Sequence, residues 1–377
     1  MNTVTLPSAY VRVDGAVELR AERAGLRPSR LPGWANAQLP SPLFALVADA
    51  ATGVRLSLRT AATTIELTVA LTRAELPGIG LLPAAFDLRI DGRHEARQYA
   101  DGGTTLRIGS SIDVVPGPVQ TIRFAGLPAV PKDVEIWLPH TAICDLVALT
   151  ADAELANPRP SDAPRWVHYG SSISQAAEAE GPLETWPAAA ATARGFDLTC
   201  LGFAGNAMLD PFVARTIRDL PAELISLEIG TNIVEQATMR ARTFGPAVHG
   251  FLDTIREGHP HTPVVVVSPI ACPVAERRSG VILHDPVRGP QALGTPADIE
   301  QGALTMEIVR GSLERLVGER AATGEALSYL SGLELLGLDE TDDLYDGIHP
   351  NAAAHRRIGA RFADVLGRQA CAPPNAS

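Results

Sequence analysis

Lysine and aromatic residues are scarce in this 377-residue sequence. Lys132 is the only lysine, and every other basic residue is arginine. A Schiff base, a Walker-type phosphate loop and a Ser-Lys dyad each need a lysine, so these chemistries are nearly excluded. The aromatic fraction of 5% disfavours an extended platform for stacking sugars, although Trp34 or Trp137 would suffice for a single stacking contact.

Long apolar runs and an excess of positive charge are also missing. No stretch approaches the roughly 18 to 20 apolar residues that span a bilayer, and the first residues lack the basic and apolar regions of a signal peptide. We therefore expect a cytoplasmic protein without a membrane span. The formal net charge of −11 argues against nucleic acid as a partner, because such a partner needs a basic face.

Cysteine is rare, and its spacing does not match a metal site. Cys144, Cys200, Cys272 and Cys371 are far apart, with no C-x-x-C motif and no histidine at zinc spacing beside them. We expect buried free thiols rather than disulfides or metal ligands.

The hydrophobic pattern changes near residue 156. Residues 54–69 alternate between apolar and polar, and Asp91-Gly92 separates two further alternating runs, as in a tight hairpin. Residues 1–155 are therefore predicted to form an all-β sandwich or jelly roll. Residues 156–165 contain three prolines and no apolar periodicity, which predicts a linker.

The rest of the chain, residues 166–370, is predicted to be an α/β domain. Short apolar runs alternate with helical segments, which indicates a parallel sheet covered on both faces. Residues 235–258 read as one long helical segment, whereas residues 271–300 lack periodicity and are expected to form a long loop, a candidate lid or wall of an acyl pocket. The apolar runs lie at residues 166–169, 198–203, 224–229, 264–268 and 327–330.

A candidate nucleophile follows the first of these runs. Gly170-Ser171-Ser172 stands at the expected carboxyl end of a strand, where open α/β sheets place their active sites. Serines after a strand are also common turn and helix-cap residues. Residues 109–112 repeat the tetrapeptide Gly-Ser-Ser-Ile inside the all-β region, where we read it as strand or turn. The tetrapeptide alone is therefore weak evidence.

Asp346 and His349 form a candidate acid–base pair before the last predicted helix. At this spacing the carboxylate can orient the imidazole and stabilise its charged form, as a general base requires. The alternative is that both are turn residues ahead of a helix capped by Asn351.

Hydrogen-bond donors follow two further predicted strands. Gly202 and Gly205 follow one, and Gly230 and Asn232 follow the other. A glycine N–H and an asparagine amide are the parts of an oxyanion hole, although glycines also end strands and asparagines also cap helices. The nucleophile, base and donors all fall at carboxyl ends of one predicted sheet.

These residues resemble the SGNH hydrolases, also called GDSL-type esterases or lipases, over about residues 166–368. The nucleophile block of that family is similar to residues 170–174, with Ser171 in place of the usual Asp and Ser172 as the nucleophile. Gly205 matches the glycine of the second block better than Gly202 does. The third and last blocks match Gly230-Thr231-Asn232 and Asp346-Gly347-Ile348-His349. Residues 1–155 are loosely similar to β-sandwich domains that precede some esterases of this type.

The resemblance implies a flavodoxin-like α/β/α domain and acyl transfer through an acyl-enzyme. Ser172, Asp346 and His349 would be catalytic, and the oxyanion hole would consist of the Ser172 N–H, the Gly205 N–H and the Asn232 amide. No cofactor or metal is implied. The expected function is a serine esterase acting on a short-chain ester of a small molecule or carbohydrate, such as an O-acetyl group.

Two alternatives remain open at this point. An acyltransferase would use the same triad with an alcohol or amine acceptor, and a non-catalytic carbohydrate-binding protein would keep only the fold. The other histidines are given structural roles: His168 is expected to pack, His355 to lie on the surface or in an interface, and His259 and His261 to lie in a solvated loop rather than bind a metal.

Overall fold

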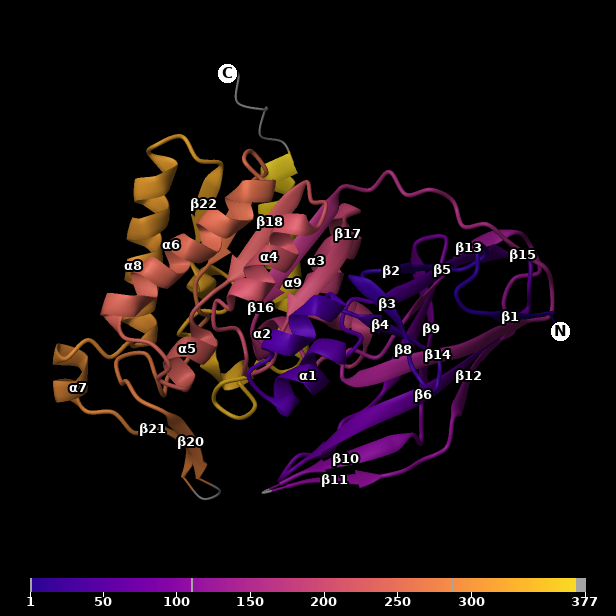
Figure 1. The fold of residues 1–377 in the computed structure, drawn as a ribbon, viewed down its shortest axis with the longest axis horizontal. Coiled ribbons are helices and arrows are strands. Elements are labelled where there is room, and N and C mark those ends of the chain that lie inside the picture. Colours follow the sequence, from indigo (N-terminus) through magenta and orange to yellow (C-terminus); the bar gives the residue numbers. More distant parts are fainter. Residues whose placement is uncertain (1, 110, 286–287, 371–377) are drawn as a thin grey trace. The chain divides into compact units, whose positions relative to one another are not determined.

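The computed structural model describes residues 2–109, 111–285 and 288–370 (Figure 1). The chain divides into two compact units. The first, the β unit, comprises residues 2–163 together with Glu180–Leu183. The second, the α/β unit, comprises Pro164–Ala179 and the residues after Leu183. The chain thus returns once to the β unit after the α/β unit has begun.

The β unit contains two sheets, as the alternating pattern predicted. The nine-stranded sheet contains β1 (Asn2–Thr5), β3 (Glu18–Ala21), β4 (Leu26–Ser29), β6 (Thr64–Leu76), β7 (Gly80–Leu81), β10 (Thr104–Ile108), β11 (Ile112–Val115), β12 (Gln120–Ala125) and β14 (Ala142–Ala151). The six-stranded sheet contains β2 (Arg12–Asp14), β5 (Arg55–Thr60), β8 (Ala85–Ile90), β9 (Arg93–Tyr99), β13 (Lys132–Trp137) and β15 (Leu155–Ala156). The predicted turn at Asp91-Gly92 joins β8 and β9, and both residues have positive φ.

The core of the β unit is built by strand alternation. Along β6 the side chains of Ile65, Leu67 and Val69 are buried, whereas the residues between them are partly exposed. Because successive side chains of a strand point to opposite faces, one face of β6 packs inward. The same cluster includes Leu56 of β5 and Phe86 of β8, so both sheets contribute to one core, as in a sandwich.

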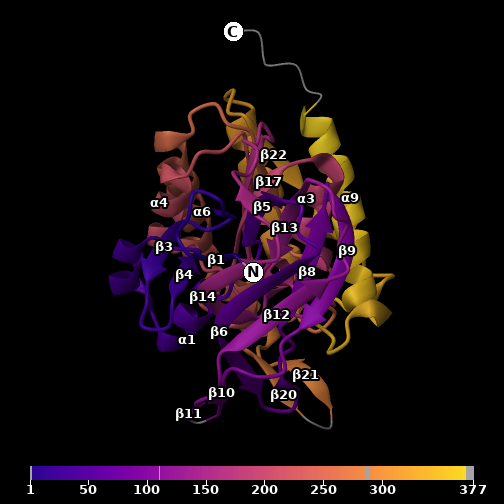
Figure 2. The ribbon, with the colours of Figure 1, turned by 90° about the vertical axis from the view of Figure 1, so that its right-hand side faces the viewer.

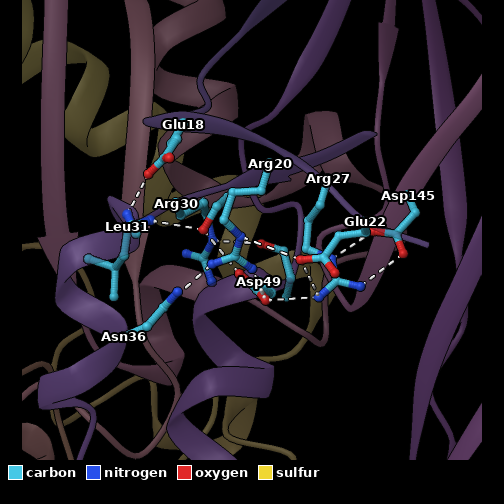
Figure 3. Close-up of polar contacts among 12 residues, drawn as sticks. Glu18, Arg20, Glu22, Arg27, Arg30, Leu31, Asn36, Asp49 and Asp145 are labelled. Carbon is cyan, nitrogen blue, oxygen red and sulfur yellow. Dashed lines mark hydrogen bonds and ion pairs between the residues drawn. The ribbon is translucent and has the colours of Figure 1, made fainter. Parts of the chain in front are cut away.

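Buried Arg30 and partly buried Arg27 bind residues of the helix α1 (Pro42–Asp49) (Figure 3). The Arg30 guanidinium donates to the carbonyl oxygens of Val47 and Ala50 at the end of this helix, where carbonyls lack helical partners. Arg27 makes two hydrogen bonds with Asp145 at 2.6 and 2.8 Å and a third with Asp49 at 3.2 Å. Each charge in this network thus faces an opposite charge or a carbonyl dipole.

The segment Glu180–Leu183 is held by residues of the six-stranded sheet. The carboxylate of Asp87, which is fully buried, accepts a hydrogen bond from the Leu183 N–H at 3.0 Å and from Arg97 Nε at 2.6 Å. A Cβ at Gly181 would lie 2.4 Å from the Arg97 guanidinium, so a larger residue there would require the Arg97 side chain to move. The strands β8 and β9 therefore bind a segment that lies beyond residue 163.

The α/β unit contains a parallel sheet of five strands in the order β17-β16-β18-β19-β22. In chain order this is 2-1-3-4-5, the flavodoxin-like arrangement, whose ligand site lies where the order reverses, beyond strands one and three. Here those strands are β16 and β18. The strands are β16 (Arg165–Gly170), β17 (Asp197–Gly202), β18 (Leu224–Glu228), β19 (Val264–Val267) and β22 (Leu327–Leu330).

Helices cover both faces of this sheet, which confirms the predicted three-layer class. Figure 2 shows α3 and α9 on one side of the sheet and α4 and α6 on the other. The helices of the unit are α2 (Ser172–Gln175), α3 (Trp186–Arg194), α4 (Pro211–Asp219), α5 (Thr231–Glu235), α6 (Ala241–Gly258), α7 (Pro296–Glu300), α8 (Met306–Ala321) and α9 (Ala352–Ala370). None of the described helices is long and apolar enough to cross a membrane.

Two segments differ from their sequence-based prediction. The single helical segment expected over residues 235–258 is interrupted, because α5 ends at Glu235 and Ala237 has a positive φ of 51° before α6 begins. The expected loop over residues 271–300 contains a hairpin of β20 (Ile282–Asp285) and β21 (Gly289–Ala292), followed by α7. The hairpin strands are too short and too polar to give a clear alternating signal.

Candidate active site

The turn after β16 presents Ser172 at the carboxyl end of the sheet. The hydroxyl of Ser171 accepts a hydrogen bond from the Ile173 N–H and caps α2, whereas Ser172 is the first residue of that helix. A Cβ at Gly170 would lie 2.1 Å from Ser174 Oγ and 2.7 Å from Glu228 Oε2. The glycine is therefore required by these close approaches. The two neighbouring serines have different surroundings, and only that of Ser172 includes His349.

Ser172, His349 and Asp346 form a continuous hydrogen-bonded series. Ser172 Oγ lies 2.9 Å from His349 Nε2, and His349 Nδ1 lies 2.8 Å from Asp346 Oδ2. The other carboxylate oxygen of Asp346 accepts the N–H groups of Ile348 and His349 at 2.9 and 2.7 Å. These backbone bonds fix the carboxylate, which in turn fixes the ring. Asn351 Oδ1 accepts the Ala354 N–H at the start of α9, as the capping alternative predicted for Asn351.

Both titratable members of the series have shifted pKa values. Burial opposes ionisation of Asp346, but hydrogen bonds from the His349 ring and from two backbone N–H groups outweigh it and lower the pKa to about 2. Burial also opposes the charged form of His349. The hydrogen bond to Asp346 and the negative charges of Glu178, Asp346 and Glu235 outweigh that effect and raise the pKa of His349 to about 9. The surroundings therefore favour the imidazolium that proton abstraction from Ser172 would create.

Within the described residues, the backbone N–H groups of Ser172 and Gly205 have no hydrogen-bond acceptor. Ser172 is at the first position of α2, and Gly205 lies in a turn after β17 with a φ of 68°. In residues 2–109, 111–285 and 288–370, neither of these two N–H groups donates to another protein atom. The Ala204 carbonyl, which shares a peptide group with the Gly205 N–H, accepts from Asn206 Nδ2 at 2.6 Å, and this bond fixes the orientation of that peptide group. Unpaired, fixed N–H groups are suited to bind a developing oxyanion.

The amide of Asn232 is held at both ends. Its Oδ1 accepts the Ala207 N–H at 3.0 Å, and its Nδ2 donates to Glu235 Oε2 at 3.0 Å. An amide nitrogen carries two hydrogens, so one N–H remains for a ligand. Asn232 is fully buried at the start of α5, which begins directly after β18. Gly202 has a different role, because a Cβ there would lie 2.6 Å from the Gln175 N, and it allows α2 to approach β17 closely.

The model of the GDSL-like lipase/acylhydrolase family matches residues 168–357, half of the chain. The chain belongs to this family. No curated protein sequence matches it. Among solved structures, the salicylyl-acyltransferase SsfX3 from a tetracycline biosynthetic pathway is 27% identical, with 99% of each chain covered and a TM-score of 0.82.

Two more distant structures share the fold with this GDSL-like chain. A GDSL-like protein from Bacteroides ovatus is 18% identical, with all of each chain covered and a TM-score of 0.70. The acetyl xylan esterase Est2A from Butyrivibrio proteoclasticus is 11% identical, with 98% of this chain and 99% of that chain covered and a TM-score of 0.58.

Several acidic residues beside the GDSL-like site were not found by sequence reasoning. Glu228 is buried at the end of β18 and accepts the Ser171 N–H, and Glu235 binds the Asn232 amide. Glu178 follows α2 and raises the pKa of His349. A carboxylate at the end of the fully buried strand β18 is the one signal that could have drawn attention to Glu228.

Three residues of this GDSL-like chain lie in surroundings that differ from the expected ones. His355, expected on the surface or in an interface, is fully buried inside the α/β unit, with its Nε2 3.6 Å from Glu178 Oε2. His259, expected in a solvated loop, is buried and its Nε2 lies 3.0 Å from the Ile217 carbonyl. Trp137 is 2% exposed beneath Arg55, so it is not a sugar-stacking surface, whereas Trp34 is 45% exposed.

Cysteine and lysine have structural surroundings. Cys144, Cys200 and Cys272 are free and buried, as predicted, and Cys371 lies outside the described residues. Lys132 Nζ donates to the carbonyls of Ala62 and Pro128 inside the β unit. No group of three or more potential metal ligands occurs in the described part of the chain.

A cavity of about 280 Å³ lies beside α5. Ile233 and Val234 of this helix line it, together with Ser279, Val281 and Leu293 from the segment that was predicted to be a loop. This segment therefore borders a cavity next to the helix that carries Asn232. Its role as the wall of an acyl pocket stays a prediction.

Proposed function

We propose that this protein is a serine esterase that hydrolyses a short-chain carboxylic ester through an acyl-enzyme on Ser172. The observation that carries the proposal is the series from Ser172 Oγ to His349 Nε2 at 2.9 Å and from His349 Nδ1 to Asp346 at 2.8 Å. Both distances are within the range of direct proton transfer and of orientation of the base. The family assignment supports the same class of chemistry.

In the proposed first half-reaction, Ser172 Oγ attacks the ester carbonyl while His349 Nε2 takes the hydroxyl proton. Asp346 holds the ring and stabilises the imidazolium. The carbonyl oxygen, now negatively charged, is bound by the N–H groups of Ser172 and Gly205 and by the remaining N–H of Asn232. His349 then gives the proton to the leaving alkoxide, and the alcohol departs from the acyl-enzyme.

In the second half-reaction water attacks the acyl-enzyme. His349 takes a proton from the water, and collapse of the second oxyanion releases the carboxylic acid and returns the proton to Ser172. The three donors act in both halves, because each forms a tetrahedral intermediate at the same carbonyl carbon.

The chain contains its own control for this proposal. Ser111 occupies the same place as Ser172 in the second Gly-Ser-Ser-Ile tetrapeptide and lies in the β unit. We expect a fluorophosphonate probe to label the peptide that contains Ser172 and to leave the peptide that contains Ser111 unlabelled.

The same two serines are tested by substitution. Ser172→Ala should lower kcat for a p-nitrophenyl ester by on the order of 10⁶-fold, and Ser111→Ala should leave it unchanged. Labelling at another residue, or near-normal hydrolysis by the Ser172→Ala protein, would refute the proposal.

An acyltransferase is the second candidate. It is favoured by the likeness to the salicylyl-acyltransferase, which is 27% identical over nearly the full length of both chains. The steps to the acyl-enzyme would be the same, but an alcohol or amine would replace water as the acceptor. Product analysis of the esterase reaction with added alcohols and amines separates the two, because only a transferase forms the new ester or amide faster than the free acid.

A further inference from the structure

Glu228 is a buried carboxylate that joins two turns of the active site. It is 3% exposed at the end of β18. Its Oε2 accepts the Ser171 N–H at 2.6 Å and the Ser174 hydroxyl at 3.3 Å, and its Oε1 accepts the Thr231 hydroxyl at 2.8 Å. Among the described residues, no arginine, lysine or histidine forms an ion pair with it. Neutral donors alone thus surround a buried carboxylate.

A chain of four polar side chains leads to this carboxylate. Trp166 Nε1 donates to Ser226 Oγ at 2.8 Å, and Ser226 Oγ lies 2.7 Å from His168 Nδ1. His168 Nε2 lies 2.8 Å from Ser174 Oγ. Burial lowers the pKa of His168 to about 3, so the ring is neutral and has one donor and one acceptor nitrogen.

The donor and acceptor of each hydrogen bond in this series follow from the groups at its two ends, the Trp166 indole and the Glu228 carboxylate. An indole N–H can only donate, and an ionised carboxylate can only accept. One arrangement uses every donor: Ser226 donates to His168 Nδ1, His168 Nε2 donates to Ser174, and Ser174 donates to Glu228. All the dipoles then point towards the carboxylate, which offsets the cost of burying its charge. His168 is therefore a polar member of this network rather than a simple packing residue.

Two of the three groups that bind Glu228 belong to residues adjacent to the proposed nucleophile and oxyanion donor. Ser171 precedes the nucleophile Ser172, and Thr231 precedes Asn232. The strands that carry these turns, β16 and β18, are hydrogen-bonded neighbours at the reversal of strand order. A single side chain thus connects the turn of the nucleophile to the turn of the oxyanion donor.

We propose that Glu228 is a positioning residue that fixes the separation between Ser172 and Asn232, so that both meet the same carbonyl group. The proposal rests on the proposed function. Because kcat depends steeply on the alignment of nucleophile and donor, loss of the connection should lower kcat more than it changes KM.

Four variants test the connection. Glu228→Met removes both acceptors at similar volume, and Thr231→Val removes one donor and keeps the shape of the side chain. Glu228→Gln keeps an oxygen for the Ser171 N–H and can donate to Thr231 through its nitrogen, and Thr231→Ser keeps the hydroxyl. The last two are therefore the conservative controls.

The expected results separate positioning from stability. Glu228→Met should lower kcat for an aryl ester on the order of 100-fold with a much smaller change in KM, and Thr231→Val should cause a smaller loss of the same kind. Glu228→Gln and Thr231→Ser should retain most of kcat. The double variant Glu228→Met/Thr231→Val should be no slower than Glu228→Met alone, because both changes act on one connection. A folded Glu228→Met protein with normal kcat and only a lower unfolding midpoint would overturn the proposal.

Hydrogen exchange provides a readout that does not need activity. In Glu228→Met, amide exchange should accelerate in the peptides that cover residues 171–176 and 231–236, while α8 stays unchanged. If the wild-type protein neither hydrolyses esters nor reacts with the fluorophosphonate, the proposed function fails, and exchange in these two peptides still decides whether Glu228 holds both turns. Unchanged exchange in both would overturn the positioning role.

Discussion

The tetrapeptide Gly-Ser-Ser-Ile occurs in both units, with different surroundings. In the β unit, Ser111 is exposed at the connection between β10 and β11, and Ser110 lies outside the described residues. In the α/β unit, Ser172 follows a buried strand and lies 2.9 Å from an imidazole. The same four residues thus have different chemical surroundings, which depend on the groups that other segments bring beside them. Ser172 is a candidate nucleophile because of the side chains around it, and each of these side chains can be replaced separately.

Among the changes that leave Ser172 in place, the largest effect is expected from the proposed oxyanion donor Asn232. Asn232→Ala should lower kcat for an aryl ester about 10²- to 10³-fold, because the remaining two N–H groups must bind the oxyanion alone. Steady-state kinetics with a parallel thermal unfolding curve will measure this. If kcat is unchanged in the folded variant, Asn232 is not part of the oxyanion hole.

Alanine substitutions of Gly170 and Gly109, the first residues of the two tetrapeptides, test how closely each one is packed. A Cβ at Gly170 would lie 2.1 Å from Ser174 Oγ, whereas at Gly109 the nearest atom is 3.7 Å away. Gly170→Ala should therefore destabilise the protein by about 1 to 3 kcal/mol, and Gly109→Ala should change stability by less than about 0.5 kcal/mol. Urea unfolding of both variants measures the difference, and equal stabilities would contradict the close packing at Gly170.

The smallest effect concerns the pH dependence. A raised pKa of His349 means that the ring is protonated, and unable to accept a proton, below about pH 9. We therefore expect kcat/KM to increase with pH, with the inflection of the acidic limb of its pH profile near pH 9, because kcat/KM reports the pKa values of the free enzyme. Glu178→Gln removes a negative charge that favours the imidazolium, so the limb should move to lower pH.

The matched control for this shift is Glu319→Gln, which changes an exposed glutamate on α8. Its limb should coincide with that of the wild-type protein. A limb that stays in place in Glu178→Gln would show that this carboxylate does not act on His349.

The parts of the fold that sequence reasoning predicted are those set by local pattern. The five parallel strands are short apolar runs bounded by helices, and the β unit has period-two alternation, so the local pattern predicts both classes. The proposed site residues were also visible, because Ser172, Gly205, Asn232 and His349 each follow a strand or precede a helix within a short motif. In such cases a few neighbouring residues determine the local structure.

The remaining features depend on residues that are distant in the chain. Glu228 acquires its partners only when β16 and β18 pair, and His355 is buried only because Glu178 and its neighbours approach α9. Trp137 is covered by Arg55 of the adjacent strand. A single sequence has no local signal for such pairings. The break between α5 and α6 is local, but it depends on a positive φ at Ala237, which alanine rarely adopts.

The return of the chain at Glu180–Leu183 affects how the molecule can be divided. A protein that begins at residue 164 would lack the Asp87 carboxylate that binds the Leu183 amide, and the four residues Glu180–Leu183 would be without their strand partners. The segment Glu180–Leu183 thus belongs structurally to the β unit, although it follows the start of the α/β unit in the sequence. A single cut between the two units therefore separates this segment from the strands that it packs against.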